Sequence, residues 1–433
     1  MPSRKHWARK VSNLTNETPG GFGIWAQNDG GEKATESADD FGLVAGLALG
    51  GHRAKRPLSV AIVDSRDPCQ SISADNDARA SAITASSRRM LEALGVWDHV
   101  GQQAQAMREI IVTDGAGHGD RPVLLQFGEG ESSACMVENR HMLAGLLAAV
   151  ETSPNITLVT GHGVTEQNFA PGLAKLKLAN GAQFSCSLVI AADGGKSASR
   201  EAAHIELVGW AYEQMGIVAS FDHELPHNGR AEEHFTPVGP FAILPLLGNR
   251  SSIVWTKGTV EAKRLLSLTA PDFEIELQNE IGGHLGKITL IGKPQGYPLS
   301  MFFAKEFHGP RLALVGDAAH VIHPLAGLGL NLGLRDVAAL AECVADAHAL
   351  GQDIGGLAVL ERYSTWRRFD TVATAASMDG FNRLFSNDIS LLRILRDIGL
   401  RATNQLTGLK QVFAREAAGQ TGSLPRLLRG DNI

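Results

Sequence analysis

The sequence feature that most constrains the fold is the stretch 311–335, which reads RLALVGDAAHVIHPLAGLGLNLGLR. Its first residues form an apolar, strand-like run that ends at Gly316 and Asp317. A loop rich in glycine comes next, and an apolar helical pattern opens near Asn331. The loop residues that should shape this turn are Pro324, Gly327 and Gly329. This order places an acid beside the N-terminus of a helix.

An acid beside a helix N-terminus suits one kind of ligand. The carboxylate of Asp317 can accept hydrogen bonds from sugar-like hydroxyls. The helix end offers free N–H groups and a positive partial charge. A polyol with a nearby anionic group, such as the ribityl chain and reduced ring of a flavin, matches both features. The alternative is that Asp317 only caps the turn that follows it.

The composition indicates a large protein with a substantial core, and it excludes some functions. The chain has 433 residues, 44% of them hydrophobic, so two lobes and an appendage are expected. The 40 basic and 46 acidic residues give a net charge of −6, which provides no basic surface for nucleic acid. The 4 cysteines are scattered, which argues against a metal site and favours a reduced, cytoplasmic setting.

Hydrophobic patterning divides the chain into segments of different character. Residues 1–40 are polar and lack periodicity, so irregular structure is expected there. Strand–helix units follow, and a β-rich insert interrupts them, which predicts a parallel sheet domain with a second sheet packed on it. We expect strands at 58–63, 108–113, 122–127, 173–178, 183–187, 188–192, 297–303 and within 206–258, and helices from 41, at 86–94, 139–150 and 259–268, and over most of the chain after 330.

Several of these segments also carry a family resemblance. The run GDAAHVIHPLAGLGLNLGLRDVAALAE resembles the second flavin-binding motif of the FAD-dependent aromatic monooxygenases. Within that group the chain is most similar to the ubiquinone-biosynthesis hydroxylases, and the resemblance covers roughly residues 58–430. The other matching segments are DARASAITASSRRMLEALGVWDHV, VENRHML, AADGGKSASRE and NRLFSNDISLLRILRDIGL.

The resemblance implies an α/β fold with a discontinuous cofactor domain. A Rossmann-like FAD-binding domain would comprise 41–205 and 301–355, with part of 104–130 facing the substrate lobe. Residues 206–300 would form a β-sheet substrate domain, and 356–433 a helical C-terminal tail. Residues 1–40 would remain an atypical N-terminal segment.

By the same resemblance, the first cofactor motif should be a strand, then GxGxxG, then an acid about 20 residues later. Asp64 ends a good strand and matches the acid that holds the adenosine ribose, which puts the glycine loop at 41–46. Phe41 and Leu43 stand where glycine is expected. The glycines that remain are Gly42 and Gly46. Either the first ~40 residues reflect a shifted reading frame or a wrong start, or FAD binds through a degenerate loop.

The resemblance assigns further residues to the cofactor. Arg79 matches an arginine beside the flavin, and Arg140 one that reaches the ribityl or phosphate region. Asp193 and Gly194 resemble the DG motif near the pyrophosphate. Read alone, these would be surface arginines and an ordinary turn. The second motif should lie against the flavin ring through Gly316, Asp317, Pro324, Gly327, Gly329 and Asn331.

No catalytic residue stands out in the sequence. His320 and His323 lie in a tight loop, where histidine is more often a structural hydrogen-bonding residue than a catalyst. The helical tail mixes apolar residues with arginines, which fits packing on the flavin lobe, contact with a membrane or partner protein, or both.

The resemblance implies hydroxylation of a polyprenylated phenolic ring in ubiquinone biosynthesis. FAD, reduced by NAD(P)H or by an external electron donor, would react with O₂ to give a C4a-hydroperoxide that attacks the ring. The expected partners are the lipid-linked phenol, O₂, other ubiquinone-biosynthesis proteins and the periphery of the inner membrane. The alternatives are a flavin oxidoreductase acting on another aromatic substrate, or an FAD-free assembly subunit without catalytic activity.

Overall fold

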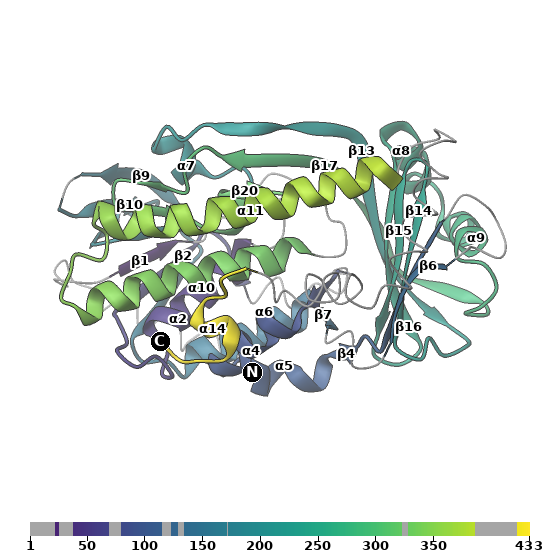
Figure 1. The fold of residues 1–433 in the computed structure, drawn as a ribbon, viewed down its shortest axis with the longest axis horizontal. Coiled ribbons are helices and arrows are strands. Elements are labelled where there is room, and N and C mark those ends of the chain that lie inside the picture. Colours follow the sequence, from purple (N-terminus) through teal and green to yellow (C-terminus); the bar gives the residue numbers. More distant parts are fainter. Residues whose placement is uncertain are drawn as a thin grey trace.

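The computed structural model describes residues 22–25, 38–68, 79–114, 123–128, 134–170, 172–322, 328–385 and 422–433. These residues form two lobes, each built around its own sheet (Figure 1). We call them the parallel-sheet lobe and the large-sheet lobe. The long helix α11 (Leu357–Phe385) extends along both, and it packs near β18 in the first lobe and β15 in the second.

The parallel-sheet lobe contains a 6-stranded sheet with the order β18-β19-β12-β1-β2-β8. All neighbouring pairs are parallel except β18 with β19. The carboxyl ends of parallel strands meet at one edge of a sheet, which is where such folds bind ligands. The strands are β1 (Phe22–Trp25), β2 (Val60–Asp64), β8 (Ile156–Thr160), β12 (Val189–Ala191), β18 (His308–Gly309) and β19 (Leu312–Leu314).

The N-terminal region differs from the sequence expectation in two respects. Strand β1 lies within the segment 1–40, for which irregular structure is expected, and it pairs with both β2 and β12 in the middle of the sheet. The segment 41–46, where the family resemblance puts a glycine loop, is instead part of helix α2 (Ala38–Gly50), as the apolar pattern from Phe41 predicts. Strand β1 has only 4 residues and its partners are distant in sequence, so no local pattern marks it.

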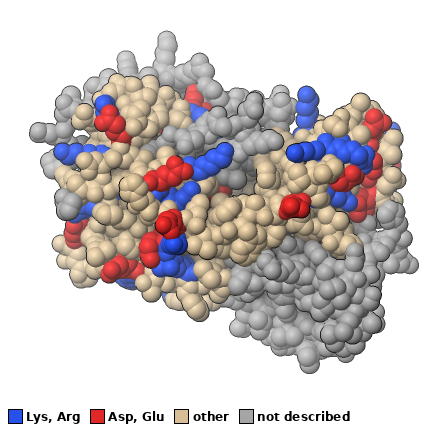
Figure 2. Space-filling model, turned by 90° about the horizontal axis from the view of Figure 1, so that it is seen from above, with Lys and Arg blue, Asp and Glu red and all other residues tan. Residues whose placement is uncertain are grey.

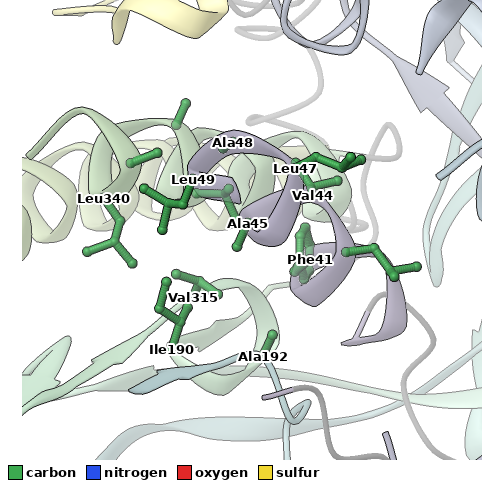
Figure 3. Packing of buried hydrophobic residues seen from close by; sticks show 14 of the residues in the cluster. Phe41, Val44, Ala45, Leu47, Ala48, Leu49, Ile190, Ala192, Val315 and Leu340 are labelled. Carbon is green, nitrogen blue, oxygen red and sulfur yellow. The ribbon is translucent and has the colours of Figure 1, made fainter. Parts of the chain in front are cut away.

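Helix α2 packs unusually close to β2. A Cβ atom on Gly46 would lie 2.6 Å from Ile62 Cδ1, and one on Gly50 would lie 2.8 Å from Val60 Cγ2. A side chain at Gly50 would also lie 2.9 Å from the Leu58 carbonyl oxygen, and one at Gly46 would force the Ile62 side chain or the helix to shift. At the start of the helix the ring of Phe41 is fully buried, near Ala192 and Val315 (Figure 3).

The other helices of this lobe include those that the hydrophobic pattern predicts at 86–94, at 139–150 and after 330. Helix α4 begins after Thr84, whose side chain accepts a hydrogen bond from the Ser87 amide as an N-cap. Helices α10 and α11 are antiparallel neighbours (Figure 1). The bounds are α4 (Ala85–Ala93), α5 (Trp97–Val100), η1 (Gly101–Gln103), α6 (Asn139–Glu151), α7 (Ala198–Ala202), η2 (Gly316–Ala318) and α10 (Leu328–Ala349).

The large-sheet lobe contains an 8-stranded sheet with the order β20-β17-β13-β16-β15-β14-β5-β6. One face is apolar and is covered by α8 and α9, with Phe221, Phe241 and Trp255 at its centre. Strands β5 and β6 pair at one edge, although they precede the insert in sequence. The bounds are β5 (Glu109–Asp114), β6 (Val123–Phe127), β13 (Leu207–His223), β14 (Arg230–Thr236), β15 (Gly239–Leu246), β16 (Arg250–Gly258), α8 (Thr259–Leu266), α9 (Ala270–Ile281), β17 (Ile288–Ala304) and β20 (His320–Val321).

Two 3-stranded antiparallel sheets complete the fold. The expected hairpin at Asn180-Gly181 is present, and Gly181 has a φ of 86°. The C-terminal residues pack back on the parallel-sheet lobe, where Arg426 reaches Glu342 and Asp346 on α10. The bounds are β3 (Ala80–Ile83), β4 (Gln105–Ala106), β7 (Cys135–Glu138), β9 (Val164–Phe169), β10 (Ala174–Leu178), β11 (Gln183–Cys186) and α14 (Arg426–Arg429).

The surface carries charges of both signs close together. On the face drawn in Figure 2, Lys and Arg side chains lie beside Asp and Glu side chains. Exposed ion pairs in the structure include Arg368 with Glu306 and Arg362 with Asp346. Within the described residues, no helix has both the length and the apolar character that a bilayer crossing requires.

Candidate functional site

A cavity of about 320 Å³ lies where the two lobes meet. One wall is the face of the large sheet that is turned away from α8 and α9. The opposite wall consists of residues from β3, η2 and the start of α10 in the parallel-sheet lobe. The lining is mainly apolar with a few polar groups, which is typical of a pocket for a small organic ligand.

The turn at Gly316 and Asp317 lies at the edge of this cavity, directly after β19. Gly316 has a φ of 57°, and a Cβ atom there would lie 2.3 Å from the Phe41 ring. The position therefore requires glycine for both its backbone conformation and its space. The turn leaves Asp317 half-buried among the cavity-lining residues.

A buried ionic cluster on the side of α10 and α11 fixes this turn. Asp336 on α10 accepts hydrogen bonds from the Gly316 amide at 3.1 Å and from His320 Nε2 at 2.6 Å. It also accepts one from Arg367 Nε at 2.8 Å, and both ionic side chains are almost completely buried. Burial alone would raise the pKa of Asp336, but the charges of His320 and Arg367 outweigh it and lower the pKa.

His320 is thus a structural hydrogen-bonding residue, and the cluster itself was missed by the sequence analysis. The available signal was an acid within an otherwise apolar helical stretch, GLRDVAALA. Such an acid must find partners when the helix is buried. Its partner Arg367 comes from α11, and nothing local in the sequence indicates that pairing.

Arg79 lines the cavity on the side of the parallel-sheet lobe. This position is compatible with the predicted contact between Arg79 and a cofactor. Burial lowers the pKa of its guanidinium to about 10, and nearby Tyr297 opposes that shift. The guanidinium remains a cation at neutral pH. Its backbone carbonyl accepts the Asn139 amide, which joins the start of β3 to the start of α6.

Asp193 and Gly194 form the turn after β12. Oδ2 of Asp193 accepts hydrogen bonds from the Ser199 amide at 2.9 Å and from the Ser199 hydroxyl at 2.8 Å, at the start of α7. Oδ1 is buried and has no hydrogen-bond partner within the described part of the chain. Burial raises the pKa of this carboxyl. Gly194 has a φ of 77°, which permits the sharp turn.

Asp64, Gly42 and Gly46 lie near the same edge of the parallel sheet. Asp64 ends β2, is buried, and accepts the Arg66 amide at 2.8 Å. Gly42 and Gly46 are helical residues of α2, where the close approach to Ile62 is the role that the last glycine of a dinucleotide motif performs. The connection between β1 and α2 lies outside the described residues.

Two of the predicted cofactor residues use their side chains within the protein. Arg140 pairs with Glu138 at 3.1 Å on the side of α6, and it is not among the cavity-lining residues. Asn331 donates from Nδ2 to the Ala82 carbonyl at 2.7 Å, and its Oδ1 accepts the Thr84 amide at 3.0 Å. The side chain of Asn331 thus fastens α10 to β3, and its place beside the cofactor stays a prediction.

The loop before α10 is described only in part. Gly329 lies in the first turn of α10 and lines the cavity, and the helix begins at Leu328, ahead of the expected start near Asn331. The predicted loop residues Pro324 and Gly327, together with His323, fall outside the described residues.

The large sheet contributes a polar group that the sequence analysis missed. Glu233 on β14 lines the cavity, and burial raises its pKa from 4.5 to about 7. The local sequence RAEEHF reads as an ordinary polar strand. Both glutamates line the cavity, and the strand pairing shows that the Glu233 side chain projects from the cavity face of the sheet.

Comparison with known proteins agrees with this architecture. Residues 42–376 match the model of the FAD binding domain family. The chain is 39% identical to the ubiquinone hydroxylase UbiL of Rhodospirillum rubrum, over 92% of this chain and 94% of that protein. It is 34% identical to the 3-demethoxyubiquinol 3-hydroxylase of Escherichia coli, over 87% of this chain and 96% of that protein.

The fold is also that of a solved monooxygenase. The p-nitrophenol 4-monooxygenase PnpA of Pseudomonas putida superimposes with a TM-score of 0.75, over 94% of this chain and 100% of that one, at 16% identity. The family match spans most of the chain, and the relatives match almost from end to end. The chain therefore belongs to the FAD binding domain family and, within it, groups with the ubiquinone-biosynthesis hydroxylases.

Proposed function

We propose that the protein is an FAD-dependent monooxygenase that hydroxylates a phenolic ring of a ubiquinone precursor. The observation that carries this proposal is the cavity between the lobes. There Arg79 and Asp317 of the parallel-sheet lobe face the apolar wall of the large sheet, against which an aromatic ring could pack. The relatives named above are a ubiquinone hydroxylase and a 3-demethoxyubiquinol 3-hydroxylase by name, and the matches cover 94% and 96% of their lengths.

The residues present fit FAD at several points of the parallel-sheet lobe. The Gly46 contact lets α2 approach the sheet as a dinucleotide fold requires. Oδ1 of Asp193 is a buried acceptor that still lacks a donor from the described chain, as expected where a ligand supplies one. These features support FAD binding despite Phe41, because its ring packs into the protein against Gly316 and Gly333.

In the bound protein, we assign separate roles to the residues along this edge. Asp64 and Asp193 would accept hydrogen bonds from the nucleotide part, and Asp317 from the ribityl chain. Arg79 would supply positive charge beside the phosphate or the ring edge. Bound FAD supplies the electrons that activate O₂ for transfer of one oxygen atom to the ring.

The protein's own contribution is to position the phenol and exclude water. Ala242, Leu244, Val254 and Leu299 make the sheet wall of the cavity apolar, so a ring can stack there while bulk water is displaced. A phenol held close to the cofactor in a cavity closed to bulk water would favour transfer of the oxygen atom to the ring over its loss to solvent.

We further propose that the substrate's lipid chain brings the protein to a membrane surface. Phe369 is 81% exposed and Val372 is 52% exposed on the same side of α11. Exposed aromatic and aliphatic side chains on one side of a helix suit an interfacial contact with lipid. Loss of vesicle binding in Phe369→Ser would support this, and unchanged binding would contradict it.

The function is tested with purified protein, a reductant and ¹⁸O₂. A prenylated phenol should gain one ¹⁸O atom on its ring, as measured by mass spectrometry. Deleting the gene should cause a quinone precursor that lacks one ring hydroxyl group to accumulate. A yellow protein that consumes O₂ without hydroxylating any prenylated phenol would favour a different aromatic substrate. A colourless protein that rejects FAD would favour a non-catalytic subunit.

A further inference from the structure

Strand register places Glu233 on the cavity face of the large sheet. Successive side chains on β14 point to opposite faces. Glu232 and His234 contact each other at 3.2 Å, and His234 stacks on Phe241 on the face covered by α8 and α9. Glu233 must therefore project from the other face, together with Ala231, which also lines the cavity.

The side chains around Glu233 on that face are apolar. Glu233 pairs with Ala242 on β15 and with Val112 on β5, and Val254 lies one strand further across the sheet. Within the described chain no hydrogen bond or ion pair holds its carboxyl group. Glu232, in contrast, is bound by His234 and by His284 at 3.0 Å.

The other titratable groups of the cavity come from the surrounding elements. They are Arg79 at the start of β3, Tyr297 on β17 and Asp317 on η2, together with Glu232, the neighbour of Glu233 on β14. None of them contributes a charge effect on Glu233, since burial is the single cause that raises its pKa to about 7. A carboxyl group with a pKa near the working pH is suited to exchange a proton with a bound ligand.

We propose that Glu233 is a catalytic residue, the general base that accepts the proton of the ring hydroxyl of the phenolic substrate. This proposal rests on the proposed function. The O–H bond of the phenol breaks as its proton moves to a carboxylate oxygen of Glu233. The electron pair stays on the phenol oxygen and increases the electron density at the ring carbon that receives the oxygen atom. The proton on Glu233 returns to solvent before the next turnover.

The neighbouring glutamate shows why Glu233, and not Glu232, is suited to act as a base. The carboxylate of Glu232 is fixed between two histidines, which hold its pKa at about 2 against the effect of burial. Glu232 therefore stays charged and bound, whereas Glu233 has no partner among the described residues that would fix its protonation state. Adjacent glutamates on one strand thus serve different purposes.

The test compares Glu233→Gln with Glu233→Asp and with the control Glu213→Gln. Glu213 is an exposed residue of β13 on the same large sheet. In FAD-loaded protein, Glu233→Gln should lower the hydroxylation rate about 100-fold, the range typical of a lost general base. It should also remove the limb of the pH–rate profile near neutrality, and Glu233→Asp should recover part of the rate.

A second readout does not depend on turnover. In the infrared spectrum, a protonated carboxyl band should titrate near pH 7 in the unmodified protein and in Glu213→Gln, and it should be absent from Glu233→Gln. Retained rate and pH profile in Glu233→Gln, in an unmodified protein that hydroxylates phenols, would overturn only this proposal. An unmodified protein that hydroxylates no phenol would overturn the proposed function and the role of Glu233 with it.

Discussion

Replacing Asp336 with Asn should destabilise the protein strongly and loosen the turn that presents Asp317. The Asp336 carboxylate is fully buried, and it accepts hydrogen bonds from Gly316, His320 and Arg367. An asparagine keeps the size but loses the charge and one acceptor oxygen. Breaking a buried ion pair from one side typically costs about 3–5 kcal/mol, because it leaves the other charge buried without its partner.

The structure places this substitution near the lower end of that range. Arg367 keeps a second carboxylate, because its Nη1 donates to Asp370 at 2.5 Å. We therefore expect a loss of about 3 kcal/mol in the free energy of unfolding, measured by urea denaturation. Asp370→Asn is the matched control, since Asp370 is 24% exposed and should cost about 1 kcal/mol.

A double-mutant cycle and a pH series separate charge from packing. Asp336→Asn combined with Arg367→Met should cost less than the sum of the two single changes, because both buried charges are gone. The depressed pKa of Asp336 stabilises the folded state above about pH 4, and this contribution should fade as the pH falls further. A loss below about 1 kcal/mol, with additive single changes, would refute the reasoning.

The remaining predictions concern packing, pairing and burial. Gly46→Leu should destabilise by about 1–3 kcal/mol in thermal unfolding, because its Cβ would lie 2.6 Å from Ile62 Cδ1. Asn331→Ala should lose about 2 kcal/mol in urea, because the Ala82 carbonyl and the Thr84 amide lose their buried partner. Glu233→Gln should be the more stable form at pH 8, where the buried carboxylate of the unmodified protein must ionise; the rise from 4.5 to about 7 corresponds to at most roughly 3 kcal/mol, and the difference should vanish near pH 4.

Each of these three has a control and a contradicting result. Gly283→Ala, just after α9, is the control for adding a side chain to a glycine, because a Cβ there meets nothing within 4 Å. Equal melting temperatures for that variant and for Gly46→Leu would mean that α2 does not pack on β2 as described. An Asn331→Ala protein with unchanged stability would contradict its fastening role, and a Glu233→Gln protein without a pH-dependent gain would contradict burial of the carboxyl.

Local patterns were sufficient for the elements that carry the second cofactor motif. The apolar run before Gly316 is β19, and the glycine turn, the acid and the helix follow in the predicted order. The helix at 139–150 and the hairpin around Gly181 also follow from periodicity and turn chemistry. In each case the neighbours that decide the structure lie within a few residues in the chain.

Features that depend on distant partners were not predictable in this way. Strand β1 is defined by its pairing with β2 and β12, and its 4 residues carry no periodicity of their own. The cluster at Asp336 joins three segments that meet only in the fold. Glu233 and Glu232 look equivalent in the sequence, and only strand pairing separates their environments.

The central claim is that Asp317 and the helix N-terminus behind it hold FAD at the edge of the parallel sheet. The most direct measurement is the amount of FAD that co-purifies with the protein and with Asp317→Ala, quantified by visible absorbance per chain. The account predicts about one FAD per chain in the unmodified protein and at least a tenfold loss of affinity in the variant. Equal FAD content and equal affinity in both proteins would contradict it.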